Sequence, residues 1–516
     1  KDNSEKHPIL FTRTPYSCAP YGETNYSPRL YNSYYTNYLK EGYIMVTQDV
    51  RGRWMSEGTF VDVRPYIENK KPGDIDESTD TYDAIDWLVK NIDNNNGNVG
   101  VFGISYPGFY STEAALSNHP ALKAVSPQAP VTDWFQGDDF HHNGAFFLMD
   151  GFNFYSGFGK PRPMPTTVGP KGFDFSTHDN YDFYLRTGAL SNFAKLMGDS
   201  ILFWKDLYAH PNLDAWWKAR NTRNTVQHIS PNIATLVVGG LFDAEDCFGA
   251  QNLYKAIEAK TKNNNKFVFG PWYHGQWASG DGSFLGNVQF GSKTAEWYEQ
   301  NIEVPFFNYY LKGKGTADNI AEATVFFSGE NKWHQLQQWP PAAAVATNLF
   351  LQSHHMASFT KTTDAKISYD EYVSDPAKPV PYTEDVHFHR TREYMDDDQR
   401  FASRRTDVLT YQTDSLTEDL TLAGSVVADL FVSLSNTDAD FIVKLIDVFP
   451  DSFKYNDNDK YVMNGYQMLV RGEVMRGRFR NSFEKPEAFI PNKTTEVKYT
   501  LPDVAHTFKK GHRVMI

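Results

Sequence analysis

The stretch VFGISYPGFYS, residues 101–111, places a serine in a glycine-flanked segment directly after a short apolar run. A strand that turns sharply into a helix at a serine lifts the hydroxyl above the carboxyl edge of the sheet. The usual pattern is Gly-x-Ser-x-Gly, whereas here Pro107 fills the last position and Gly108 follows one residue later. A Gly-x-Ser triplet alone occurs in many loops. Ser105 is therefore a candidate nucleophile only if the chain also supplies its partners.

Those partners occur later in the chain, each just past a predicted strand. A serine hydroxyl needs a base, and the base needs a carboxylate that orients it. Asp243 follows the apolar run IATLVVGG (233–240), and His274 follows NKFVFGPW (265–272). On a parallel sheet with such a turn, the order is Ser, then Asp or Glu, then His. We therefore predict a catalytic triad of Ser105, Asp243 and His274.

Alternating strand and helix patterns surround the serine motif. Residues 76–92 place Ile85, Leu88, Val89 and Ile92 at i, i+3, i+4 and i+7, which is one face of an amphipathic helix. Predicted strands lie before and after it, at 7–16, 41–51, 99–103 and 122–131. This alternation is typical of a parallel sheet covered on both faces. We expect residues 1–133 and 231–316 to form this α/β domain.

Two other regions break the alternation. Residues 134–230 are rich in aromatic residues, Gly and Pro and contain helical pieces, which favours a helical cap inserted between two strands of the sheet. A purely structural subdomain is the alternative. Residues 317–516 contain short alternating stretches separated by turn residues, beginning with ATVFFSG (323–329). They predict an all-β sandwich or jelly roll at the C-terminus.

Composition argues against several functional classes. The net charge of -13 argues against nucleic acid as the main partner, and no run of about 18 apolar residues indicates a membrane span. The two cysteines provide no disulfide framework. His141 and His142 lie beside two aspartates, but adjacent histidines point in different directions and no metal-ligand spacing supports them. We therefore predict no metal site.

Seven motifs, in the same order along almost the whole chain, make the sequence similar to the α-amino-acid ester hydrolases. They are RTPY (13–16), QDVRGRW (48–54), GISYPG (103–108), GDDFHHNGAF (137–146), GLFDAED (240–246), GPWYHGQW (270–277) and KGHRV (510–514). This family belongs to a wider group with cocaine esterase, glutaryl-cephalosporin acylase and the X-Pro dipeptidyl peptidases. The resemblance implies an α/β-hydrolase domain, an inserted helical cap and a C-terminal jelly roll. It also includes the Gly-x-Ser-Tyr-x-Gly form of the serine turn.

Cleavage of an ester or amide builds negative charge on the carbonyl oxygen, which needs donors already in place. The turn at Ser105 directs the backbone N–H of Tyr106 toward that oxygen. The resemblance implies that the second donor is the hydroxyl of Tyr16. The alternative for Tyr16 is a core tyrosine whose hydroxyl is satisfied by other groups.

By the same resemblance, three acidic residues hold the α-ammonium group of the substrate: Asp139, Glu245 and Asp246. A desolvated ammonium needs compensating charge and acceptors for its three N–H groups. Crowded carboxylates raise one another's pKa, and a bound cation relieves that repulsion. Acids in the first turn of a helix also stabilise its positive end, and this interpretation covers at least one of Glu245 and Asp246.

These residues lead to the hypothesis of a serine hydrolase that cleaves esters or amides of α-amino acids through an acyl-enzyme. The acyl group passes to water or to an amine such as a β-lactam nucleus. The main alternative is an X-Pro dipeptidyl peptidase; a glutaryl-cephalosporin acylase and a non-catalytic carbohydrate-binding protein are less favoured. We expect a small ester, amide or short peptide as partner, without nucleic acid, membrane or cofactor. The resemblance adds export and homo-oligomer formation, which some relatives show.

Overall fold

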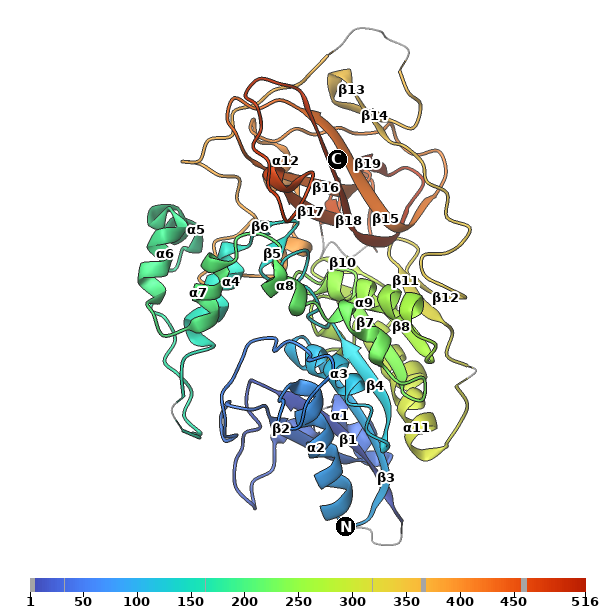
Figure 1. Cartoon of the computed structure of the whole chain (residues 1–516). Coiled ribbons are helices and arrows are strands. Elements are labelled where there is room, and N and C mark those ends of the chain that lie inside the picture. The colour runs from blue at the N-terminus through green and yellow to red at the C-terminus, as the bar shows by residue number, and fades with distance from the viewer. Residues whose placement is uncertain (1–4, 32, 163, 318, 363–367, 456–461) are drawn as a thin grey trace.

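The computed structural model describes residues 5–31, 33–162, 164–317, 319–362, 368–455 and 462–516. Within these residues, one large sheet has the strand order β12-β11-β8-β7-β4-β3-β1-β2. All neighbours in this sheet are parallel except β11 and β12. The strands are β1 (His7–Thr14), β2 (Ile44–Asp49), β3 (Asn95–Ile104), β4 (Leu122–Gln128), β7 (Ala234–Gly240), β8 (Asn265–Gly270), β11 (Ala323–Phe327) and β12 (Lys332–Leu336). The predicted α/β fold is confirmed (Figure 1).

Helices cover both faces of the sheet because successive side chains of a strand point to opposite sides. In β3, Val101 belongs to a core cluster that includes side chains of α2, α3 and α9, whereas its neighbour Phe102 packs with side chains of α1 and α11. These helices are α1 (Ser33–Lys40), α2 (Glu77–Asn91), α3 (Tyr106–Leu116), α9 (Cys247–Lys260) and α11 (Val304–Lys312). The predicted helix at 76–92 is α2, and Asp76 caps it by accepting the backbone N–H of Thr79.

Between β4 and β7 the chain forms a mainly helical segment. It contains β5 (His141–His142), β6 (Ala145–Phe146), α4 (Leu148–Gly157), α5 (Asn180–Thr187), α6 (Leu190–Met197), α7 (Leu202–Ala209) and α8 (Ala215–Ala219). Figure 1 shows α4, α5, α6 and α7 together at one side of the molecule. Aromatic residues dominate their shared core, among them Phe152, Phe193 and Trp204. The aromatic richness of this stretch therefore serves packing in the first place.

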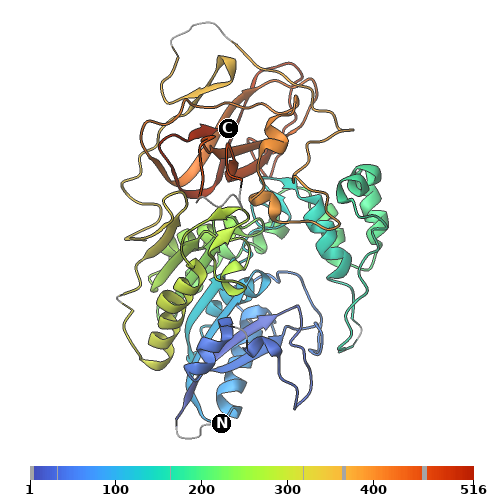
Figure 2. The same ribbon diagram turned by 180° about the vertical axis from the view of Figure 1, so that it is seen from behind.

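The C-terminal part is a β-domain at the far end from the N-terminus (Figures 1 and 2). Its strands are β13 (Phe350–Gln352), β14 (Met356–Ser358), β15 (Leu420–Val432), β16 (Asp440–Val448), β17 (Gln467–Arg476), β18 (Thr495–Phe508) and β19 (Arg513–Met515). Strand β15 pairs antiparallel with β18, and β16 pairs antiparallel with both β17 and β19. The predicted β-rich domain is confirmed, while its finer topology as a jelly roll stays a prediction.

Strands β11 and β12 differ from the prediction, which places 323–329 in the C-terminal sandwich. Instead β11 pairs in parallel with β8, and β12 pairs antiparallel with β11, so both extend the α/β sheet. An alternating pattern shows which side chains share a face, but it does not identify the strand that pairs through backbone hydrogen bonds. The sheet therefore continues to Leu336, past the predicted boundary at 316.

Within the described residues, none of the helices has the length and apolar character needed to cross a lipid bilayer.

Candidate active site

Ser105 lies on the sharp turn that the sequence predicts. It follows β3 and immediately precedes α3, with φ of 71° and ψ of -127°, a backbone region that residues other than glycine rarely adopt. Its own N–H donates to the carbonyl of Gln128 at the end of β4 (2.9 Å), while its carbonyl accepts the N–H groups of Gly108 and Phe109. These bonds hold the strained turn in place, which is the arrangement expected of a functional site.

The displaced glycine of the motif has a steric reason. A Cβ at Gly108 would lie 2.5 Å from the Gln128 carbonyl oxygen, and a Cβ at Gly103 would lie 2.5 Å from Cβ of Pro107. Gly108 therefore allows α3 to approach the end of β4 closely, and Gly103 allows β3 to turn closely into α3. Position 107 takes proline because it is within the first turn of α3, where the missing N–H costs nothing.

Asp243 and His274 lie at the same edge of the sheet as Ser105. The three residues follow β3, β7 and β8, which run parallel and therefore end at one edge. Nδ1 of His274 lies 2.9 Å from Oδ2 of Asp243 and 3.1 Å from Oδ1. Oδ1 also accepts the backbone N–H groups of Glu245 and Asp246, which fixes the buried carboxylate. The imidazole is thereby oriented through Nδ1, and Nε2 remains for a substrate or a hydroxyl.

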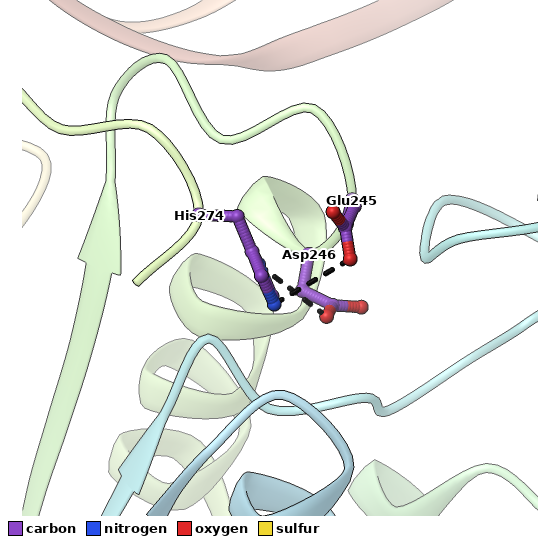
Figure 3. A group of neighbouring side chains, drawn as sticks. All are labelled: Glu245, Asp246 and His274. Atoms are coloured by element: carbon purple, nitrogen blue, oxygen red, sulfur yellow. Dashed lines mark ion pairs between the residues drawn. The ribbon is translucent and has the colours of Figure 1, made fainter. Parts of the chain in front are cut away.

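His274 is surrounded by negative charge. Nε2 lies 3.5 Å from Oε2 of Glu245, and Nδ1 lies 3.9 Å from Oδ2 of Asp246. Figure 3 shows the imidazole directed toward both carboxylates at the N-terminal end of α9. Burial lowers the pKa of His274, but Asp243 and Glu245 outweigh it and raise the pKa to about 9. At neutral pH the surrounding carboxylates therefore favour the charged form of the imidazole.

The side chain of Tyr16 lies near that of Ser105. Burial raises the pKa of Tyr16 well above its ordinary value, Asp139 and Glu245 add to the effect, and the Ser105 side chain opposes it. The tyrosine therefore stays protonated and retains a hydrogen to donate. Tyr106 supplies the first N–H of α3, and the first N–H groups of a helix have no acceptor within it. The side chain of Tyr106 is held away, with its hydroxyl accepting from Val63 N (2.7 Å).

A partly buried carboxylate, Asp139, and a fully buried one, Asp246, lie beside the triad. Trp134 Nε1 donates to Oδ2 of Asp139 (2.7 Å), and the backbone N–H of Asp139 donates to the Glu245 carbonyl (2.9 Å). Both oxygens of Asp246 are buried and accept no hydrogen bond from the residues that the structure describes. Burial, together with Glu245, raises the pKa of Asp139 to about 7, and burial, together with Asp139 and Asp138, raises the pKa of Asp246 well above its usual range.

The helix-capping interpretation finds limited support in this geometry. Asp246 occupies the N-cap position of α9 but makes no side-chain capping bond, and Glu245 lies before the helix. The side chains of these acids are thus turned toward His274 rather than toward the N–H groups of the helix.

Glu245 has a cationic partner that the sequence patterns do not reveal. Nη2 of Arg390 lies 3.1 Å from Oε1 of Glu245, and Nη1 lies 2.7 Å from Oδ1 of Asp150 in α4. Burial opposes ionisation of Glu245, but His274 and Arg390 lower its pKa to about 2. A single sequence contains no signal that pairs Arg390 with residues so distant in the chain.

The two adjacent histidines are used for packing. His141 Nδ1 lies 2.9 Å from the Trp134 carbonyl, and burial lowers its pKa to about 4. His142 Nδ1 lies 2.9 Å from Glu473 in β17 and so joins the helical segment to the β-domain. Among the described residues, potential metal-ligand atoms cluster within 4.8 Å of one another at Glu245, Asp246 and His274. We do not assign them as ligands, because His274 is committed to Asp243 and Glu245 to Arg390.

Aromatic side chains of α4 line one side of the candidate site. The Tyr16 ring lies 6.5 Å from that of Phe154 and 5.8 Å from that of Phe158, centroid to centroid. The exposed fraction of Tyr16 is 42%, so its ring faces open space beside these aromatics. This arrangement supports the expectation that an apolar group of a ligand binds next to the serine.

A parallel sheet with a strained serine turn and an Asp–His pair at its carboxyl edge defines a serine hydrolase of the α/β-hydrolase fold. The family model "X-Pro dipeptidyl-peptidase (S15 family)" matches residues 1–276, and "X-Pro dipeptidyl-peptidase C-terminal non-catalytic domain" matches residues 309–516. The chain belongs to the S15 family of hydrolases. The group identified from the seven motifs is thus confirmed.

Individual relatives carry different activities in their names. The chain is 26% identical to the cocaine esterase of Rhodococcus sp. (strain MB1 Bresler), covering 99% of this chain and 85% of that protein. A solved α-amino acid ester hydrolase superposes with a TM-score of 0.92 at 36% identity, covering 100% of this chain and 84% of that one. A solved aminopeptidase from the marine sediment archaeon Thaumarchaeota archaeon gives 0.90 at 38% identity, covering 99% and 84%.

Proposed function

We propose that the protein hydrolyses esters or amides of α-amino acids through an acyl-enzyme on Ser105. His274 takes the Ser105 proton on Nε2 as the oxygen attacks the substrate carbonyl, and Asp243 stabilises the imidazolium that forms. The Tyr106 N–H and the Tyr16 hydroxyl donate to the oxyanion. His274 then protonates the leaving alcohol or amine, and water or an amine acceptor such as a β-lactam nucleus releases the acyl group by the reverse steps.

The observation that carries this proposal is the buried carboxylate of Asp246, which accepts no hydrogen bond from the described residues. A buried carboxylate without a donor is costly, so a site that retains one is suited to a ligand that brings its own N–H groups and positive charge. Asp139 contributes to the raised pKa of Asp246, and Glu245 contributes to the raised pKa of Asp139, so this cluster favours a bound cation. An α-ammonium group beside the reacting carbonyl supplies the missing charge.

An X-Pro dipeptidyl peptidase is the second candidate. The family model and the aminopeptidase relative favour it, because such enzymes also act next to a free N-terminal amine. The apolar side of the site formed by Phe154 and Phe158 accepts either an aromatic acyl side chain or a proline ring. A glutaryl-cephalosporin acylase is disfavoured, because the acidic cluster repels a glutaryl carboxylate.

A substrate panel tests the proposal. We expect phenylglycine methyl ester to be hydrolysed with much higher kcat/KM than phenylacetic acid methyl ester, which lacks the α-amine. Gly-Pro-anilide provides the peptidase arm of the same panel. Faster turnover of the anilide than of both esters would favour the dipeptidyl peptidase, and equal rates for the two esters would contradict ammonium recognition.

The variant Asp139→Asn separates binding of the ammonium from the chemical step. We expect it to lower kcat/KM for the amino ester far more than for the des-amino ester. The isosteric amide can still accept the hydrogen bond from Trp134 Nε1, but it lacks the negative charge. A labelling experiment addresses the non-catalytic carbohydrate-binding alternative. A fluorophosphonate should label the wild type but not Ser105→Ala, and equal labelling of both would refute Ser105 as the nucleophile.

A further inference from the structure

Arg390 brings a positive charge into the acidic cluster from the C-terminal part of the chain. It lies between β14 and the short helix Glu393–Met395, and its guanidinium bridges Glu245 beside the triad and Asp150 in α4. Its side chain is only 27% exposed, as expected for a residue enclosed by two carboxylates. The chain thus supplies one fixed cation to a site that is proposed to bind a cationic substrate.

The neighbouring backbone holds Arg390 in this position. His387 and His389 accept hydrogen bonds on their carbonyls from the backbone N–H and side chain of Asn180 in α5, both at 2.9 Å. Arg392 donates through Nη1 to the carbonyl of His274 (2.7 Å). The segment 387–392 is therefore tied to the helical segment on one side and to the His274 loop on the other.

Glu245 lies between two cations. Its Oε1 faces Arg390 at 3.1 Å, and its Oε2 faces Nε2 of His274 at 3.5 Å. Nε2 is also the atom that must accept the Ser105 proton in the proposed reaction. A Glu245 released from Arg390 would close onto the imidazolium with a charge-assisted hydrogen bond and occupy Nε2, which must be free to take the Ser105 proton.

We propose that Arg390 is a positioning residue that limits the approach of Glu245 to Nε2 of His274, holding the two atoms at 3.5 Å, and leaves Asp139 and Asp246 as the pair that receives the substrate ammonium. The second half of this statement rests on the proposed function, whereas the first half concerns only the serine and its base. The division follows from the pairing of the two acids: Glu245 forms an ion pair with Arg390, whereas neither oxygen of Asp246 accepts a hydrogen bond from the described part of the chain.

Several titratable and charged groups set the electrostatic environment of His274. The acids are Asp243, Glu245 and Asp246 in the loop after β7 and Asp139 in the segment after β4, with Asp150 of α4 acting through Arg390. The cations are Arg390 and Arg392 of the 387–392 segment. Tyr16, after β1, is neutral. Removing Arg390 leaves the carboxylates with one counter-charge fewer, and Glu245 is the one that directly faces Nε2.

The test uses four variants of the chain beside the wild type: Arg390→Met, Arg390→Lys, Glu245→Gln and the double variant Arg390→Met/Glu245→Gln. The rate of inactivation by phenylmethanesulfonyl fluoride is measured against pH, since this uncharged reagent needs an active base but no substrate amine. We expect Arg390→Met to move the half-maximal pH upward by about one unit, which slows inactivation about tenfold at pH 7. Arg390→Lys should restore most of the rate.

The double variant identifies the path of the effect. If Arg390 acts by restraining Glu245, Arg390→Met should shift the pH profile of inactivation much less in the Glu245→Gln background than in the wild type. The effects of the two substitutions are then non-additive. An equal shift in both backgrounds would overturn the proposal and assign Arg390 a direct effect of charge. An Arg390→Met profile with an unchanged midpoint and a reduced maximum rate would also overturn the proposal, because that result indicates misfolding. Thermal melting of each form reports misfolding independently.

The panel of amino and des-amino esters, run on Glu245→Gln and on a further variant, Asp246→Asn, tests the second half. We expect Glu245→Gln to retain the preference for the amino ester and Asp246→Asn to lose most of it. Equal losses in both variants would overturn the division of the cluster. If the wild type shows no such preference, the proposed substrate class fails, while the inactivation profiles still decide the role of Arg390.

Discussion

The negative charge of Glu245 should shift the pH profile of Ser105 reactivity, because it raises the pKa of the base His274. In the variant Glu245→Gln one negative charge is removed 3.5 Å from Nε2 of His274, while the size of the side chain is kept. Two unit charges about 4 Å apart interact by about 4 kcal/mol at an effective dielectric constant of about 20. The real effect is smaller, because the charge is shared between two oxygens and Arg390 lies 3.1 Å from one of them.

Half of that value, about 2 kcal/mol, corresponds to about 1.5 pKa units. Neutralising Glu245 removes a group that favours the imidazolium, so the pKa of His274 falls. Starting from about 9 in the wild type, it should reach about 7.5 in the variant. The neutral fraction of the base at pH 7 then rises from about 1% to about 24%, so Ser105 should react about 20-fold faster at that pH.

The assay is the second-order rate of inactivation by phenylmethanesulfonyl fluoride between pH 5.5 and 10. Asp150→Asn is the matched control, because Asp150 also binds Arg390 but makes no contact with His274 among the interactions described. It should move the profile by less than about half a unit, given its greater separation from the imidazole. A Glu245→Gln profile that coincides with the wild type, or lies at higher pH, would refute the electrostatic reasoning.

Three further outcomes are expected. Ser105→Ala should lower kcat by about a million-fold, measured with the amino ester under conditions that exclude traces of wild type; a loss under a hundredfold would point to another nucleophile. Tyr16→Phe should lower kcat by about 10²- to 10³-fold with little change in KM, since the oxyanion forms only in the transition state; a change in KM alone would make Tyr16 a binding residue. Dialysis against EDTA should leave activity unchanged, and a loss restored by Zn²⁺ would instead assign the acidic cluster to a metal.

Local patterns were sufficient for the parts of the fold that depend on neighbouring residues. The helix Glu77–Asn91 follows from apolar residues at helical spacing and a capping aspartate. The turn at Ser105 follows from a glycine, a serine and an apolar run, and the shifted glycine is explained by the contact of Gly108 with Gln128. In such elements, the residues that decide the conformation lie within a few positions of one another.

Features that depend on distant partners could not be predicted. Strand Ala323–Phe327 has an ordinary strand pattern, but its place beside β8 depends on backbone pairing that any strand can make. The pairing of Arg390 with Glu245 depends on the tertiary fold, and the sequence offers many other acids to an arginine. The absence of a side-chain capping bond at Asp246 could not be predicted for the same reason, since only the structure shows where the carboxylate points.

The position of Arg390 also bears on how the two matched regions cooperate. It lies in the region whose family description is a non-catalytic domain, yet its guanidinium contacts a carboxylate that faces the proposed base. Nothing in the proposed chemistry requires Arg390 to touch the substrate, so the description and the proposal agree. An arginine carried on a separate segment compensates charge only when that segment is docked, because charge pairing weakens steeply with distance and solvent. If the proposed role of Arg390 holds, we therefore expect docking of the C-terminal part to influence the protonation of His274 and, through it, the reactivity of Ser105.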